Sequence, residues 1–489
     1  MSQVDTRHYL KQFSKAFWVA NSVELLERLA YYAVFIVLTI YLSNIWGFSD
    51  AQAGIISGVF SALLYLLPTF VGAVADKIGF RSSIILAFSL LSVGYFSLGI
   101  FPTLLENAGL VAYGTGKGEG PFSDFFSNIG LIEFGRNTTF LGLRESIHQW
   151  AIVPILAFLV VGGAFIKSVI SGTVAKETTS ETRARGFAIF YTMVNIGAFT
   201  GKTVVDPLRK SLGDSGLIYL NYFAAFMTLA ALVVVIFFYK SSQTSGEGKT
   251  LKETWQALLK VCSNGRLLVL ILITSGFWTV QQQMYASMPK YVIRMVGEDA
   301  SPGWIANVNP FVVFLCVNLV TSFMKKRSAL SSITVGMFII PISALIMASG
   351  NLMGSELILG FHPITLMMMI GIAFQALAEC FISPRYLEYF SLQSPKGEEG
   401  LYLGFSHLHS FVSSLIAFVV SGFLLEAFCP DPNSERFAHS LDFHADYAAA
   451  TANAHYLWLV FFVIGSISAI ALVIYNRYVK NSEKAVAEL

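Results

Sequence analysis

Three ionisable side chains stand close together in an apolar stretch near the start of the sequence. Glu24, Glu27 and Arg28 are followed by Tyr31, and at 3.6 residues per turn all four share one face of a helix. An ion at the centre of a membrane helix costs ~2.5–3.5 kcal/mol, so such residues usually face a water-filled cavity. We therefore predict a proton or solute site here. A buried salt bridge that only fixes helix packing is the alternative, although such pairs stabilise poorly.

Two more ionisable residues stand alone in apolar segments, Lys167 in the fourth and Glu379 in the tenth. A lysine near a membrane boundary can extend its ammonium group to water, which is the alternative role for Lys167. A glutamate cannot reach so far, and an isolated one in apolar surroundings tends to take up a proton. A cation in one half and an anion in the other predict a pair that a zwitterionic solute can separate.

Two histidines and one glutamine are weaker candidates for a functional role. His407 and His409 could titrate near neutral pH, but on an apolar helix we interpret them as packed polar residues. Gln282 could line a solute site or serve as a packing amide.

The elements that must position these residues are membrane helices. Of the 489 residues, 55% are hydrophobic and only 13% are charged, about half the charged fraction of a soluble domain. The formal net charge of +2 suggests no nucleic-acid partner. The four cysteines form no CxxC pair and have no zinc-site spacing with histidine. We predict no metal, no organic cofactor and no cleavable signal.

Apolar stretches of about 20 residues, the length that crosses the hydrocarbon core, recur between polar breaks. They predict twelve transmembrane spans, near 16–45, 50–75, 81–104, 149–174, 184–206, 216–239, 267–295, 303–324, 328–350, 362–387, 400–427 and 453–477. Segment 240–265 is the long connection between the sixth and seventh spans. It predicts an N-terminal six-helix bundle (1–240), a linker (241–265) and a C-terminal six-helix bundle (266–489).

Lysine and arginine in the short loops predict the orientation, because cytoplasmic loops carry an excess of them. Successive connections alternate between the two sides of the membrane, and one alternating set is rich in these residues. It holds Lys77, Arg81, Lys176, Arg183, Arg185, Lys240, Lys249, Lys252, Lys260, Arg266, Lys325, Lys326, Arg327, Arg477 and Lys480. Both termini should therefore be cytoplasmic, as an even number of spans requires. Two six-helix bundles joined by a cytoplasmic linker resemble the major facilitator superfamily, an all-α membrane fold.

Several motifs resemble one branch of that superfamily. The run from Glu24 to Tyr32 is similar to the ExxERFxYY motif of the proton-dependent oligopeptide transporter family, with Leu29 where Phe is usual. The other matches, in the family's order, are the loop motif at 72–81, Lys167 in the fourth span, FYxxINxG at 190–197, W…NP at Trp304, Asn309 and Pro310, and E…SP at Glu379, Ser383 and Pro384.

The resemblance implies a proton-coupled symporter that imports di- or tripeptides, or peptide-like solutes, by alternating access. It implies that protons are the coupling ion and that the protein works as a monomer in the inner (plasma) membrane. By position, Glu24, Glu27, Arg28 and Glu379 would couple proton binding to transport. Lys167 would attract the solute's carboxylate and Glu379 its amino group. The other expected lining residues are Tyr31, Tyr32, Tyr65, Asn195, Trp278 and Gln282.

Two departures from the family pattern concern one charged pair. Phe35 and Gln282 stand where the family usually has an arginine and a seventh-span glutamate. Both charges are missing together, as expected if they formed an ion pair, because losing one alone would leave the other buried without a partner. The less charged pocket leaves open a non-peptide solute on the same scaffold, with or without proton coupling.

Two other classes of function fit less well. A membrane sensor would bind solute without flux. An intramembrane enzyme could use Glu24 and Glu27 as an acid/base pair, but no nucleophile or metal cluster accompanies them in the sequence. We therefore predict that the protein is not an enzyme.

Overall fold

The computed structural model describes residues 12–109, 112–113, 138–139, 147–179, 181–240, 250–393, 405–437 and 440–487. Within these residues the chain is helical apart from loops and one pair of two-residue strands. The strands, β1 (Ala112–Tyr113) and β2 (Thr138–Thr139), pair antiparallel in the loop after the third span. The predicted all-α class is confirmed.

The chain divides into two compact units. The first contains Met1–Phe35 and Leu66–Trp255, and the second contains Ile36–Tyr65 and Gln256–Leu489. Residues 36–65 therefore belong with the C-terminal half of the sequence. The predicted division into 1–240 and 266–489 places them in the N-terminal half instead. The two six-helix bundles stay a prediction. Residues 241–249 of the predicted linker lie outside the described residues, and α11 (Leu251–Cys262) forms most of the rest.

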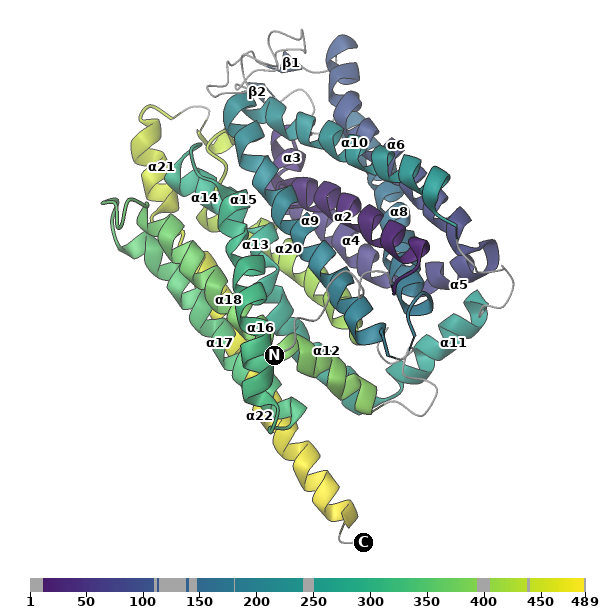
Figure 1. Cartoon of the computed structure of the whole chain (residues 1–489). Helices are drawn as coiled ribbons and strands as arrows, with labels where there is room; N and C mark the ends of the chain where they lie inside the picture. The colour runs from purple at the N-terminus through teal and green to yellow at the C-terminus, as the bar shows by residue number, and fades with distance from the viewer. Residues whose placement is uncertain are drawn as a thin grey trace. The chain divides into compact units, whose positions relative to one another are not determined.

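In the first unit, α2 packs against α9 and α10, and α6 packs against α8 and α10 (Figure 1). Its elements are α2 (Lys15–Phe35), α5 (Pro68–Ile78), α6 (Phe80–Asn107), the 3-10 helix η2 (Ile147–Ala151), α8 (Ile152–Lys176), α9 (Arg183–Leu212) and α10 (Asp214–Phe238).

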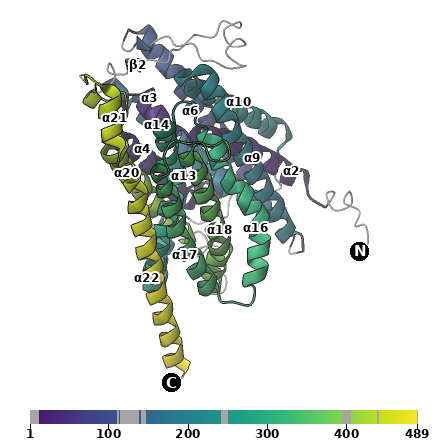
Figure 2. The same ribbon diagram turned by 90° about the vertical axis from the view of Figure 1, so that its left-hand side faces the viewer.

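In the second unit, α18 packs along α17 and α16, and the long α22 packs along α17 and α12 (Figure 2). Its elements are α3 (Leu38–Asn44), α4 (Asp50–Leu66), α12 (Gly265–Gln281), α13 (Gln283–Ala286), α14 (Met288–Val296), α15 (Pro302–Ala306), α16 (Val308–Met324), α17 (Ala329–Ser349), η3 (Gly350–Leu352), α18 (Pro363–Leu392), α20 (Leu408–Phe428), η4 (Glu435–Phe437), α21 (Phe443–Thr451) and α22 (Tyr456–Ala487).

Each of the twelve predicted spans overlaps a helix. In the described part of the chain, nine helices are long and apolar enough to cross a bilayer, or eleven if α2 with α3 and α4 with α5 each count as one span. The remaining predicted span, 184–206, coincides with α9. This helix has 30 residues, which is long enough, but it carries Lys202, Asp206 and Arg209 and is too polar to be counted with the others.

Several predicted spans are divided into shorter helices, and in two of them a proline stands at the break. Within 267–295 the chain forms α12, α13 and α14, with Pro289 in the first turn of α14. Within 50–75, α5 begins at Pro68. Proline lacks the amide hydrogen that would continue the preceding helix, and its fixed φ suits the first turn of a new one.

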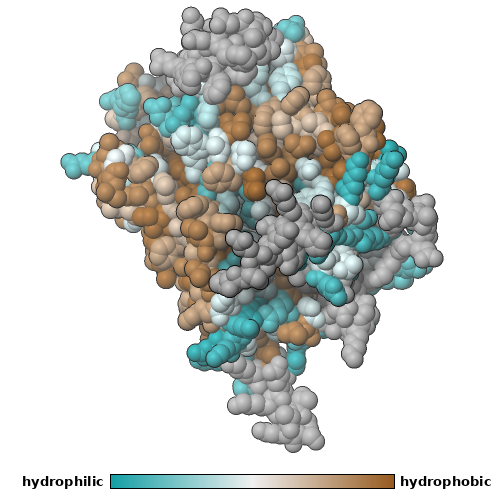
Figure 3. Space-filling view, viewed as in Figure 1, coloured by the Kyte–Doolittle hydropathy of each residue, from teal (hydrophilic) through white to brown (hydrophobic). Residues whose placement is uncertain are grey.

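Large apolar side chains lie on the outer faces of helices in both units. In the first unit α10 exposes Phe226, Val233 and Phe237, and in the second α17 exposes Phe338 and Ile342. Figure 3 shows apolar residues gathered over α10 and over α17 and α18. Soluble proteins rarely expose contiguous patches of this kind. A hydrocarbon environment removes the cost, which agrees with the predicted membrane spans.

Candidate functional site

The predicted ionic group on α2 forms as expected and is buried. Arg28 Nε lies 3.1 Å from Glu24 Oε1, and Arg28 Nη2 lies 2.5 Å from Glu27 Oε2. Glu24 is 4% exposed, Glu27 2% and Arg28 7%. One guanidinium therefore balances two carboxylates away from bulk water. Neutralising either carboxylate by a proton changes the balance, which is what a proton-binding group requires.

The backbone of α9 approaches this group closely at two glycines. A Cβ atom on Gly197 would lie 2.7 Å from Arg28 Cβ and 2.8 Å from the Leu25 carbonyl oxygen. A Cβ on Gly201 would lie 2.5 Å from the Leu29 carbonyl oxygen. Only residues without a side chain allow two helices to pack at this distance. The glycine of the 190–197 motif thus holds α9 against the residues of α2 that carry the charge.

Gly197→Ala should therefore destabilise the protein by about 1–3 kcal/mol, because the added methyl group has to displace α9 from α2. The melting temperature of purified protein in detergent measures the effect. Gly265→Ala is the matched control, since a Cβ there meets nothing within 4 Å. Equal melting temperatures for Gly197→Ala and wild type would contradict this account of the helix contact.

Aromatic rings continue from the ionic group along α2. The guanidinium of Arg28 lies 5.4 Å from the centre of the Tyr31 ring, and Tyr31 stacks on Phe35 with 4.9 Å between ring centres. Lys202 Nζ of α9 lies 5.5 Å from the centre of the Tyr32 ring. Cations at these distances are attracted to the ring faces. Phe35 thus continues an aromatic surface at the position where the family usually has a cation.

Two further predicted residues belong to the same unit. Lys167 of α8 lies close enough to Glu24, Glu27 and Arg28 for their charges to interact with its own. Asn195 of α9 donates through Nδ2 to the carbonyl oxygen of Tyr191, 2.8 Å away. Its amide group is thus engaged within its own helix. Its role in solute binding stays a prediction.

The remaining predicted residues, Tyr65, Trp278, Gln282 and Glu379, lie in the second unit. Gln281 Nε2 and Asn309 Nδ2 both donate to Glu379 Oε2, at 3.0 and 3.1 Å. The three side chains come from the end of α12, the first turn of α16 and the middle of α18. Both donors to this oxygen are neutral amides.

Trp278 and Gln282 lie one helical turn apart at the end of α12. Trp278 stacks on the buried His409 ring, with 5.0 Å between ring centres, and His409 Nε2 lies 3.0 Å from Ser410 Oγ. Gln282 Nε2 donates to Ser414 Oγ at 3.3 Å. His409 is therefore packed, in agreement with our interpretation. Tyr65 is half-buried near the end of α4.

The structure thus gathers the predicted residues into two groups, one in each unit. Glu24, Glu27, Arg28 and Lys167 form one charged group with Tyr31 and Tyr32, and Trp278, Gln282 and Glu379 lie in the other unit. The predicted pairing of Lys167 with Glu379 stays a prediction. Within the described residues no group of three or more His, Cys, Asp or Glu side chains could hold a metal ion.

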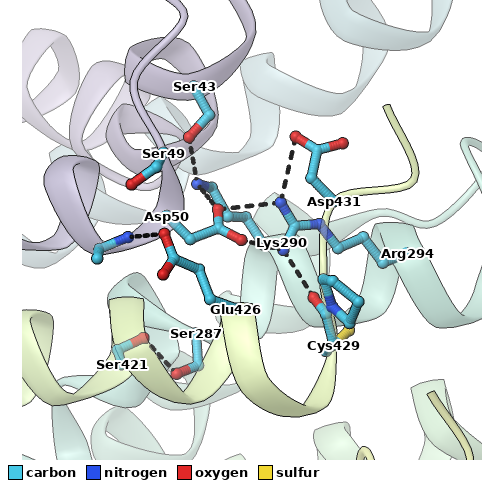
Figure 4. Close-up of polar contacts among 12 residues, drawn as sticks. Ser43, Ser49, Asp50, Ser287, Lys290, Arg294, Ser421, Glu426, Cys429 and Asp431 are labelled. Atoms are coloured by element: carbon cyan, nitrogen blue, oxygen red, sulfur yellow. Dashed lines mark hydrogen bonds and ion pairs between the residues drawn. The ribbon is translucent and has the colours of Figure 1, made fainter. Parts of the chain in front are cut away.

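A buried ion cluster in the second unit was not predicted from the sequence. It consists of Asp50, Lys290, Arg294 and Asp431 (Figure 4). Asp50 Oδ1 lies 2.5 Å from Lys290 Nζ, and Asp50 Oδ2 lies 2.6 Å from Arg294 Nη1. Arg294 Nη2 lies 3.5 Å from Asp431 Oδ2.

Three more contacts tie this ion cluster to its surroundings. Lys290 Nζ also donates to Ser43 Oγ at 2.6 Å, and Arg294 Nη1 also donates to the Cys429 carbonyl oxygen at 2.8 Å. Glu426 accepts a hydrogen bond from the backbone of Ala51. The start of α4 is thus fastened to α14 and to α20, and α14 in turn contacts the chain after α20.

The sequence did contain a signal for some of these residues. Lys290 lies inside a predicted apolar span, as does Lys202, which is 1% exposed. The criterion that selected Lys167 and Glu379, an ion inside an apolar span, also applies to these two lysines. Asp50 stands at the edge of its span, where a charge is ordinary, so only the fold shows that it is buried.

Comparison with known proteins agrees with this architecture. The family model of the Major Facilitator Superfamily matches residues 22–355, more than half of the chain. The chain belongs to the major facilitator superfamily. Within it, the chain is 24% identical over 525 residues to dipeptide and tripeptide permease B of Aliivibrio fischeri (strain MJ11), covering 97% of each chain. It is also 24% identical to the permease B of Photorhabdus luminescens, covering 83% of this chain and 87% of the relative.

Solved structures of proton dependent oligopeptide transporters, the POT family, show the same fold. One, from work on substrate recognition in proton dependent oligopeptide transporters, aligns with a TM-score of 0.66 at 18% identity and covers 95% of this chain and 99% of that chain. The POT family transporter PepTSo aligns with a TM-score of 0.66 at 16% identity, over 95% of this chain and 98% of that chain. The predicted major facilitator fold is confirmed.

Proposed function

We propose that this chain is a proton-coupled symporter that imports di- and tripeptides, or peptide-like solutes, by alternating access. The observation that carries the proposal is the match to a dipeptide and tripeptide permease over 97% of both chains. A match of this extent includes both units, so every residue group of the candidate site lies within it. The buried ionic group on α2 supplies side chains of the kind that proton coupling requires.

Each group of residues has a role in this proposal. Glu24 and Glu27 exchange protons, and Arg28 stabilises their charged forms by its ion pairs. Lys167 attracts the carboxylate of the solute, and Glu379 binds its amino group. Tyr31, Tyr32, Tyr65, Asn195, Trp278 and Gln282 line the path. A peptide zwitterion carries one charge of each sign, which matches one cation and one anion.

The available driving force is sufficient for concentrative uptake. A proton gradient of one pH unit supplies ~1.4 kcal/mol, and a membrane potential of 100 mV adds ~2.3 kcal/mol per charge. Together they can concentrate a neutral solute roughly a few hundredfold. The membrane is the inner (plasma) membrane with both termini cytoplasmic, as the distribution of lysine and arginine favours.

Uptake into proteoliposomes under an imposed proton gradient tests the function. Labelled di- and tripeptides should accumulate above the external concentration, and a proton ionophore should abolish the accumulation. Protein-free liposomes are the control. If no member of a peptide library accumulates or competes with the labelled solute, the assignment to peptides fails.

A second candidate function is transport of a non-peptide solute on the same scaffold, with or without proton coupling. It is favoured by Phe35, which is buried and stacked on Tyr31, and by Gln282, which is bonded to Ser414. Both positions carry charges in the family pattern. Transport that is insensitive to proton ionophores, with no competition by peptides, would support this candidate over the first.

A further inference from the structure

Gln281 stands one residue before the position that the family motif singled out, and its amide reaches the carboxylate proposed to bind the solute's amino group. Gln281 Nε2 donates to Glu379 Oε2 at 3.0 Å, and Asn309 Nδ2 donates to the same oxygen at 3.1 Å. Three helices, α12, α16 and α18, therefore meet at one carboxylate oxygen. Two fixed donors restrain the side chain of Glu379 to one orientation.

The Gln281 amide turns its NH2 group toward Glu379, because the hydrogen bond runs from Gln281 Nε2 to Glu379 Oε2. Its carbonyl oxygen Oε1 is buried and accepts no hydrogen bond from the described residues, and the residue is 6% exposed. A buried acceptor without a donor is unfavourable, so this position favours a ligand that brings an N–H group.

We infer that Gln281 is a specificity-determining residue for solutes that carry a primary ammonium group. The inference rests on the proposed function, in which Glu379 binds the amino group. Gln281 Nε2, together with Asn309 Nδ2, holds the Glu379 carboxylate in one orientation. Gln281 Oε1 is a second acceptor beside that carboxylate.

The ligand chemistry follows from these two acceptors. An ammonium group has three N–H donors, so it can bond to both the carboxylate and the amide oxygen. An N-acylated solute has lost the positive charge and two of the three donors. Gln281 should therefore favour a free amine over the same solute with its amine acylated.

Binding of alanyl-alanine and of N-acetyl-alanyl-alanine to the purified full-length protein tests the inference. Wild type should bind the free amine more tightly. Gln281→Met keeps the size of the side chain and removes the amide. It should weaken binding of alanyl-alanine by about 10- to 100-fold, and change binding of the acetylated solute by less than about threefold. Gln281→Asn keeps the amide but is one methylene shorter, and it should show the same loss.

Gln283→Leu is the matched control, because Gln283 Nε2 donates to the carbonyl oxygens of Thr279 and Ala417. It should lower the melting temperature and leave the ratio of the two affinities unchanged. If wild type binds the free amine more tightly and both Gln281 variants keep the wild-type ratio of the two affinities, the role of Gln281 is overturned and the proposed function stands. If wild type binds neither solute, both fail. If Gln281→Met does not fold, the result for Gln281→Asn decides.

Discussion

Replacing Glu27 with Gln should abolish uptake driven by a proton gradient while sparing exchange of solute between the two sides of the membrane. Glu27 is 2% exposed, and its carboxylate lies 2.5 Å from the Arg28 guanidinium. Gln has nearly the shape of a protonated Glu but cannot release a proton. Accumulation should therefore fall from roughly a few hundredfold to about onefold. Counterflow moves solute without net proton transfer, so it should continue.

Paired assays of gradient-driven uptake and counterflow in the same proteoliposomes measure this effect. Glu388→Gln is the matched control, since the Glu388 side chain is 44% exposed and pairs with Arg385 on the same helix. Exposed pairs of this kind contribute little, and both assays should match wild type. Equal loss of uptake and counterflow in Glu27→Gln would indicate a structural role for Glu27, and the proposed coupling role would be withdrawn.

Asp50→Asn should destabilise the protein more than any other single change in the second unit considered above. The variant keeps the size of the side chain but leaves Lys290 and Arg294 buried without the carboxylate that contacts both. Removing one partner of a buried ion pair costs about 3–5 kcal/mol, because an uncompensated charge stays in apolar surroundings. The melting temperature of the purified protein should fall by about 3–5 °C, because a chain of 489 residues unfolds with a large entropy.

Two further variants test the cause of this loss. Asp431→Asn should have a small effect, since the Asp431 side chain is 21% exposed and lies 3.5 Å from Arg294. Adding Lys290→Met to Asp50→Asn should recover part of the lost stability, because it removes one stranded cation. If the double variant were less stable than Asp50→Asn alone, the loss would have to come from packing rather than from unbalanced charge.

Contacts between residues that lie close together in the chain could be predicted from the sequence. Glu24, Glu27 and Arg28 are within one turn of α2, so helical spacing alone places them on one face, and the structure agrees. The apolar spans were also predicted well, because the length needed to cross a bilayer is fixed. The exception is α9, whose buried Lys202 and Asp206 lower its hydropathy.

Contacts between distant segments were beyond what spacing can predict. Asp50 and Lys290 are 240 residues apart, and nothing in either local sequence indicates the other. Gln282 was selected from the sequence because the family motif usually has a glutamate at this position. The amide that reaches Glu379 belongs to its neighbour Gln281. Adjacent residues on a helix point about 100° apart, so only the fold, which brings Glu379 of α18 to the end of α12, determines which amide meets the carboxylate.

The grouping of residues 36–65 with the C-terminal half has a consequence for biosynthesis. Asp50 leaves the ribosome 240 residues before Lys290. At roughly 5–20 residues per second, its carboxylate has no partner for about 10–50 s of translation. During that interval the nascent hairpin has to keep Asp50 in water at the membrane surface, since an isolated carboxylate is excluded from lipid. Residues 36–65 can therefore reach their final position only after the seventh span has been synthesised.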